Sequence, residues 1–164
     1  MNASYPADPS RGSTTSAVIA QTLEDHPDVV AELTAAHDAA WEAVDPVLLE
    51  LCRLRVAMLL GCTSELSTRT PAAVAAGLDE RTVAQLASWP TSPRFDPRSR
   101  ACLAFTEQFV IDVASLDHGL TDAVTSHLGS AGLVDLAHAL LVVEQRQRLS
   151  LAWQQLLDPV GTAS

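Results

Sequence analysis

Apolar residues recur along most of the chain with the spacing of one helix face. In residues 29–41 they fall three or four positions apart, which indicates an amphipathic helix. The segment 47–60 is apolar on nearly every side and stops at Gly61, so we expect a central helix with a glycine at its C-terminal end. Segments that alternate strictly between apolar and polar positions are scarce. The pattern therefore predicts an all-α fold.

Helix start signals divide the chain into connected segments. Asp45-Pro46 and Asp96-Pro97 each place a side-chain acceptor before a proline at the first helical position. Thr121 begins a short helix that is predicted to end near Gly129, and the last helix is expected over residues 133–157. Together these signals predict a single-domain bundle of six to seven helices.

The segment after the central helix is expected to be broken. Thr63 or Ser64 is the predicted N-cap of the next helix. Pro71 interrupts that helix, because the residue before a proline resists α geometry, and a restart capped by Thr70 is expected. Asp79 is the predicted cap of the helix that follows.

The two ends of the chain differ in character. Residues 1–20 begin with small, polar and proline-containing sequence, which predicts a flexible N-terminal arm that is able to order across a subunit contact. Residues 21–164 are expected to form one helical domain, since 164 residues suffice for a single core.

Charge and composition exclude several function classes. The formal net charge is −10, which disfavours nucleic acid and anionic membranes as partners. All ten basic residues are arginine, so lysine Schiff-base chemistry and the lysine of a P-loop are excluded. Three cysteines without a secretory apolar segment predict a cytoplasmic protein with reduced thiols. The five histidines show no metal-ligand spacing, so neither a metal nor another cofactor is expected.

The central helix carries charges that need an explanation. Glu50 and Arg53 are three residues apart and share a face, either as a structural ion pair or as catalytic groups. Cys62 precedes a predicted helix N-terminus, where a thiolate is favoured, although a cysteine after Gly61 also suits tight packing. Glu65 in the first helical turn is favoured by the helix dipole and would raise the pKa of a nearby thiol.

Other polar residues in the helices are assigned structural roles first. His138 on the apolar last helix is interpreted as a core histidine, which leaves open that it supplies an imidazole to a pocket. His37 and Trp41 fall on one helix face and are expected to touch. Arg146 and Arg148 lie about 200° apart around a helix, so at most one points inward, where it would suit a carboxylate. A solvated face is the preferred interpretation of both.

The segment ELCRLRVAMLLGC, followed by a helix ending at Gly77-Leu78 and by DPRSRACLAF, resembles the carboxymuconolactone decarboxylase and alkylhydroperoxidase D superfamily. The resemblance extends from about Trp41 to Leu157. It implies an all-α fold and assembly as a homo-oligomer, a trimer or hexamer, with sites near subunit contacts. A nearly all-apolar central helix in so small a protein agrees with such an assembly.

The resemblance also implies which motif positions carry chemistry. In the peroxidase branch a glutamate lies twelve residues before a CxxC pair, and a histidine follows the second cysteine by four. Glu50 and Cys62 occupy the first two positions, whereas Glu65 replaces the second cysteine and Arg69 the histidine. A second branch, near the lactone decarboxylases, reads GCxYEWxxH. Glu65 agrees with its glutamate, and Ser64, Leu66 and Arg69 replace the tyrosine, tryptophan and histidine.

These substitutions favour non-redox chemistry. The first hypothesis is a small-molecule enzyme that decarboxylates or rearranges a carboxylated or lactone-like substrate. Glu50 and Glu65 would be the paired acid and base, Arg53 or Arg69 would bind the substrate carboxylate, and Cys62 would line the pocket. The alternatives are a single-cysteine peroxide reductase acting through Cys62 and a catalytically silent oligomeric scaffold or binding subunit. The first hypothesis requires Glu50 and Glu65 to face one cavity beside the sulfur of Cys62.

Overall fold

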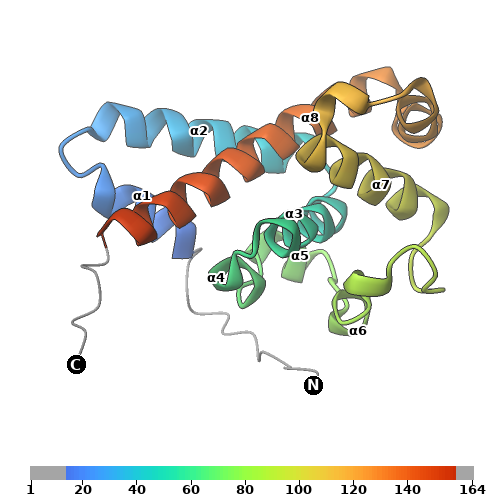
Figure 1. The fold of residues 1–164 in the computed structure, drawn as a ribbon, viewed down its shortest axis with the longest axis horizontal. Coiled ribbons are helices and arrows are strands. Elements are labelled where there is room, and N and C mark those ends of the chain that lie inside the picture. The colour runs from blue at the N-terminus through green and yellow to red at the C-terminus, as the bar shows by residue number, and fades with distance from the viewer. Residues whose placement is uncertain (1–13, 158–164) are drawn as a thin grey trace.

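A computed structural model describes residues 14–157, and within that range every regular element is a helix (Figure 1). The all-α prediction is thereby confirmed. The α-helices are α1 (Thr14–Thr22), α2 (Pro27–Ala43), α3 (Pro46–Leu60), α4 (Thr63–Leu66), α5 (Pro71–Ala75), α6 (Glu80–Val83), α7 (Pro97–Ile111) and α8 (His118–Leu157). Two 3-10 turns, η1 (Leu86–Ser88) and η2 (Val113–Ser115), complete the set.

The predicted start signals are confirmed by their hydrogen bonds. The Asp45 carboxylate accepts from the backbone N–H of Leu48 at 2.9 Å and caps α3. Asp96 does the same for α7, and Asp79 for α6. Gly61 ends α3 in the left-handed conformation, with φ of 71°, which a residue with a side chain adopts only at a cost.

Helix α3 forms the centre of the bundle, as its apolar composition predicts. It packs against α7 and α8 and carries the short helices α4 and α5 on another side. Helix α8 crosses the molecule and also contacts α1 and α2 (Figure 1). The core is mostly leucine, valine and alanine, with Trp89, Phe95 and Phe105 as its buried aromatic side chains.

The predicted N-terminal arm is wrong for its last seven residues. Residues 14–20 belong to helix α1, which packs against α8 and α4 and buries Ile19 and Thr15. The arm was predicted from small polar residues, but a single apolar anchor and tertiary contacts order this segment. Residues 1–13 of the predicted arm lie outside the described residues.

The segment after Gly61 is broken as predicted, but its first cap differs. The N-cap of α4 is Cys62, so the prediction of Thr63 or Ser64 is wrong. Thr70 does precede Pro71 at the start of α5, although its hydroxyl makes no capping bond there. Only Cys62 stands between Gly61, which ends α3, and Thr63, which begins α4, so Cys62 takes the capping position.

Helix α8 consists of two helical parts joined at Gly129. This residue has φ of 74° and ψ of 171°, outside helical geometry, which confirms the predicted helix end there. By length and composition, His118–Gln155 is apolar enough to cross a membrane. Core helices share that composition, and α8 packs on four other helices of the bundle.

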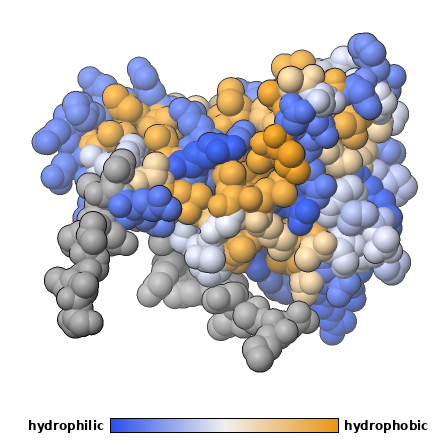
Figure 2. Space-filling view, in the orientation of Figure 1, coloured by the Kyte–Doolittle hydropathy of each residue, from blue (hydrophilic) through white to orange (hydrophobic). Residues whose placement is uncertain are grey.

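One face of α8 leaves large apolar side chains exposed. Val134 and Leu141 lie two turns apart and are 66% and 55% exposed. Figure 2 shows apolar side chains gathered on the side of the molecule that α8 crosses. A face of this kind suits contact with a second copy, and assembly as a trimer or hexamer stays a prediction.

Candidate functional site

Glu50 and Arg53 form a bidentate ion pair inside the bundle. Arg53 Nε donates to Glu50 Oε2 at 2.9 Å and Nη2 to Oε1 at 2.6 Å. Glu50 is 0% exposed, and it also accepts from the backbone N–H of Thr70 at 3.2 Å and from the Thr70 hydroxyl at 3.0 Å. Four donors therefore hold this carboxylate in place.

The same guanidinium reaches Glu65 on α4. Arg53 Nη1 donates to the Glu65 carboxylate and, at 3.1 Å, to the Glu65 carbonyl oxygen. Its Nη2 also donates to the carbonyl oxygen of Thr68 at 3.0 Å. A guanidinium has five N–H groups, and all five of Arg53 are used. Arg53 thus fixes α4 and the loop after it against α3.

Glu50, Arg53 and Glu65 are buried together, so each charge is stabilised mainly by its partners in the cluster. Burial alone would lower the pKa of Arg53, but hydrogen bonds and charges from Glu50 and Glu65 raise it above its ordinary value. Two carboxylates surround one cation, and hydroxyl and amide donors compensate the surplus negative charge. The Thr15 hydroxyl donates to Glu65, as Thr70 does to Glu50.

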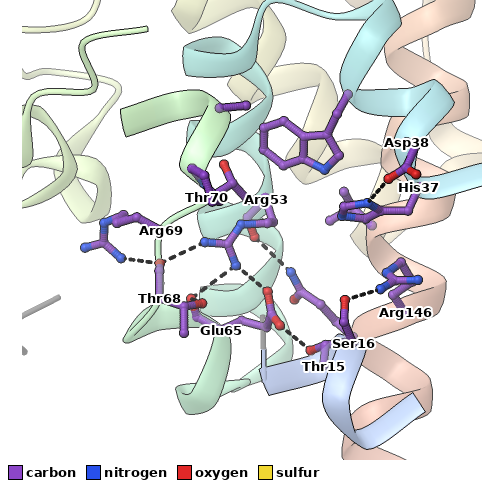
Figure 3. Close-up of a pocket in the computed structure, with 15 residues that line it drawn as sticks. Thr15, Ser16, His37, Asp38, Arg53, Glu65, Thr68, Arg69, Thr70 and Arg146 are labelled. Atoms are coloured by element: carbon purple, nitrogen blue, oxygen red, sulfur yellow. Dashed lines mark hydrogen bonds and ion pairs between the residues drawn. The ribbon is translucent and has the colours of Figure 1, made fainter. Parts of the chain in front are cut away.

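A cavity of about 370 Å³ opens beside this ion cluster (Figure 3). Its volume lies in the range of small-molecule binding sites. Helices α1, α2, α3, α4, α5 and α8 and the loop between α4 and α5 all contribute to its wall. The lining residues are Thr15, Ser16, His37, Asp38, Trp41, Arg53, Glu65, Thr68, Arg69, Thr70, Pro71, Ala72, Val143, Arg146 and Gln147.

The structure separates the predicted site residues. Glu65, Arg53 and Arg69 line the cavity, whereas Glu50 and Cys62 are not among its lining residues. The expectation that both glutamates face one cavity beside the sulfur is therefore wrong. Glu50 sits behind Arg53, whose guanidinium lies between the two carboxylates and separates Glu50 from the cavity.

Cys62 is a packed cysteine in this structure. Its side chain is fully buried, and its sulfur lies 3.4 Å from the Ser64 hydroxyl. Helix α4 has only four residues, too short for the dipole effect that was expected to favour a thiolate. Burial raises the pKa of Cys52 to about 12 and that of Cys102 to about 11, so both remain thiols at neutral pH.

Arg69 is largely committed to other partners. Its Nε and Nη2 donate to the two carboxylate oxygens of Glu80 at 2.8 and 3.0 Å. Its Nη1 donates to the carbonyl oxygens of Leu66 and Thr68 at 2.9 and 2.7 Å. Four of its five N–H groups are used. Arg69 therefore holds the loop after α4 in place, and only one N–H group is left to bind a substrate.

Helices α2 and α8 bring two chemical groups that were not assigned to the site from the sequence. His37 lines the cavity, and its Nδ1 lies 3.3 Å from Asp38 Oδ1. Arg146 is the inward arginine of the last helix, whereas Arg148 is 56% exposed and pairs with Glu144. Figure 3 shows His37, Asp38 and Arg146 together, across from the loop that carries Thr68 and Arg69.

His37 is the histidine among the residues that line the cavity. The predicted contact with Trp41 is confirmed, with ring centroids 6.1 Å apart. His138, which was interpreted as a core histidine, is exposed instead. The spacing of His37 and Trp41 indicated only a shared face, because a helix pattern does not reveal which neighbour covers that face.

The titration of His37 is expected to report on Arg146. Burial lowers the pKa of His37 first, and the Arg146 charge lowers it further, against the raising effects of Asp38 and Glu65. In Arg146→Met we expect this pKa to rise relative to the wild type, and in the control Arg148→Met to stay unchanged. NMR titration of the imidazole carbon signals measures both, and equal values in the two variants would contradict the assignment.

The same shift has a consequence for stability. Because the folded-state pKa lies below the unfolded value of about 6.5, the unfolded chain binds the proton more readily. Stability from this group is therefore present above that pH and is lost as pH falls through the folded pKa. His37→Gln is expected to flatten the acid side of the stability curve, measured by urea unfolding between pH 7 and pH 5.

Comparison with known proteins agrees with this architecture. The model of the carboxymuconolactone decarboxylase family matches residues 27–108, half of the chain. No curated protein matches it. The matched region holds α2 to α7, and with them Glu50, Arg53 and Glu65, and it ends before α8. Because the family model matches half of the chain and the fold is an all-α bundle, the chain belongs to the carboxymuconolactone decarboxylase family.

Proposed function

We propose that this protein is a small-molecule enzyme of the non-redox branch of its family. It would act by proton transfer on a carboxylated or lactone-like substrate, with decarboxylation or a related rearrangement as the reaction. One observation carries the proposal: the Glu65 carboxylate forms part of the wall of a cavity of about 370 Å³, and no cysteine of the described chain does.

Glu65 and His37 are the proton-transfer groups of this proposal. Arg53 and Thr15 donate hydrogen bonds to the Glu65 carboxylate and hold it at the cavity wall, where a proton-transfer group has to lie. His37 has its Nδ1 toward Asp38, so its other ring nitrogen is available for a proton. The pair of Glu65 and His37 replaces the predicted pair of Glu50 and Glu65. In the revised assignment Glu50 is a positioning residue for Arg53.

The reaction leaves an electron pair on a substrate carbon and needs an acid that protonates that carbon. When a carboxylate leaves as CO₂, its bonding electron pair stays on the substrate carbon. An enzyme acid must then protonate that carbon, and in a rearrangement a base first removes a proton elsewhere. Glu65 and His37 line the same cavity and so are able to divide these two tasks.

The alternatives receive less support from the site. A peroxide reductase needs an accessible thiolate, whereas Cys62 is fully buried and outside the cavity lining. A silent scaffold was expected to lack a formed polar cavity, and this chain has one with charged groups from helices α2, α3, α4 and α8. We therefore retain the enzyme as the proposed function.

Cys62→Ala is expected to leave turnover unchanged. The assay is CO₂ release or absorbance change with a panel of carboxylated lactones. Cys102→Ala is the matched control, because it removes a second fully buried sulfur and so carries a similar packing cost. Loss of turnover in Cys62→Ala alone, together with a sulfenic acid trapped at Cys62 under mild peroxide, would favour the redox alternative.

A further inference from the structure

We propose that Arg146 of α8 is the anchor for the substrate's carboxylate, so that the cavity takes a small carboxylate anion. The role of Arg146 in catalysis rests on the proposed function. Its role in binding a carboxylate is testable without turnover. Arg146 also replaces Arg53 and Arg69, which the sequence suggested for this role.

The hydrogen bonds of Arg146 leave most of its donors available. Its Nη1 donates to the Leu33 carbonyl oxygen at 3.2 Å, and its Nη2 donates to the Ser16 hydroxyl at 2.6 Å. Within residues 14–157, no carboxylate lies within the 4.0 Å of an ion pair with it. Its Nε–H and one N–H on each terminal nitrogen therefore have no partner in the described chain.

The other two arginines of the cavity lack this capacity. Arg53 has all five N–H groups bound to Glu50, Glu65 and Thr68. Arg69 has four of five bound, two of them to a carboxylate. A bidentate carboxylate needs two adjacent N–H groups on one guanidinium, and Nε with its neighbouring Nη provides them in Arg146.

The buried position of Arg146 makes an anion favourable there. Its side chain is nearly fully buried, and burial lowers its pKa, while the more distant charges of Glu65 and Asp38 raise it. A buried charge without a direct partner is costly, and an incoming carboxylate would supply that partner. The two existing hydrogen bonds fix the guanidinium plane before a ligand arrives, which reduces the ordering cost.

Two residues of the same wall each carry a buried polar atom that has no partner in the described chain. The two atoms are Gln147 Oε1, an acceptor, and Trp41 Nε1, a donor. The Gln147 amide is oriented by its nitrogen, which donates to the Arg53 carbonyl oxygen at 3.1 Å. Both atoms are shielded from solvent, so the assignment of Arg146 does not depend on them.

Binding of small carboxylates tests the proposal directly. The probes are succinate, lactate and benzoate, each compared with its neutral amide, and dissociation constants come from calorimetry. We expect carboxylates to bind the wild type more tightly than the amides. Arg146→Met should weaken carboxylate binding about ten- to a hundred-fold, the scale of charge-assisted hydrogen bonds. Arg148→Met, on the same helix but exposed, should bind like the wild type.

Two measurements keep the test decisive if Arg146→Met unfolds. Arg146→Lys retains the charge but not the planar fork, so it should bind carboxylates with intermediate affinity. A wild-type crystal soaked with 4-bromobenzoate should show the carboxylate against Arg146. Equal binding of acids and amides by the wild type, equal affinities of Arg146→Met and Arg148→Met, or a carboxylate placed away from Arg146 would each overturn the proposal.

Failure of the anchor and failure of the proposed function give different results. If carboxylates bind through Arg146 but no carboxylated lactone is turned over, the anchor stands and the proposed function falls. If turnover is found and Arg146→Met changes neither KM nor binding, the anchor falls and the proposed function stands.

Discussion

Arg53→Met is expected to lower the free energy of unfolding by about 3–5 kcal/mol, the usual cost of removing one partner of a buried ion pair. The substitution leaves Glu50 and Glu65 buried without their shared cation. It also removes the donors to the carbonyl oxygens of Glu65 and Thr68, which hold α4 and the following loop against α3.

Chemical denaturation with urea measures this loss. For a domain of this size each kcal/mol shifts Tm by about 2–4 °C, so the shift should be on the order of 10 °C. The control is Arg148→Met, which removes an exposed pair with Glu144 and should cost less than about 1 kcal/mol. Similar losses in the two variants would contradict the structural role of the ion cluster.

An apolar replacement of the whole cluster separates packing from charge. In Glu50→Leu/Arg53→Met/Glu65→Leu the three charges of the cluster are removed together, so we expect stability to recover relative to Arg53→Met alone. Turnover should nevertheless be absent, because the cavity loses Glu65, the proposed proton-transfer group. Recovery of turnover in this variant would remove Glu65 from the mechanism.

Glu65→Gln is expected to reduce turnover about 10²- to 10⁴-fold, the usual contribution of a general acid or base. Glutamine retains the size of the side chain and one acceptor oxygen for Arg53 and Thr15, but it does not exchange a proton at neutral pH. The measurement is kcat on the best substrate of the lactone panel, taken well below the Tm of the variant.

Two controls separate chemistry from folding in that experiment. Glu50→Gln weakens the same ion cluster from outside the cavity, so it should lose stability and show a smaller fall in kcat. Glu144→Gln alters a surface pair of α8 and should behave as the wild type. If Glu50→Gln and Glu65→Gln lose kcat equally, Glu65 acts only by holding the structure.

Part of the site follows from helix geometry and was predictable. Glu50 and Arg53 meet because residues three apart share a helix face. Asp45, Asp96 and Gly61 mark helix ends because caps depend on side-chain chemistry within a few residues. The family resemblance pointed to Glu65, which does line the cavity.

The sequence by itself therefore determined the all-α bundle, its central helix, the main helix ends and the Glu50–Arg53 pair, since each depends on contacts within about one helical turn. Tertiary structure alone decided what faces the cavity. Arg146 meets Leu33 and Ser16 across 113 and 130 residues of chain, and Thr15 meets Glu65 across 50. Helical periodicity shows which residues share a face but not what that face packs against. For this reason Cys62 and Glu50 were placed in the cavity, while His37 and Arg146 were left out of it.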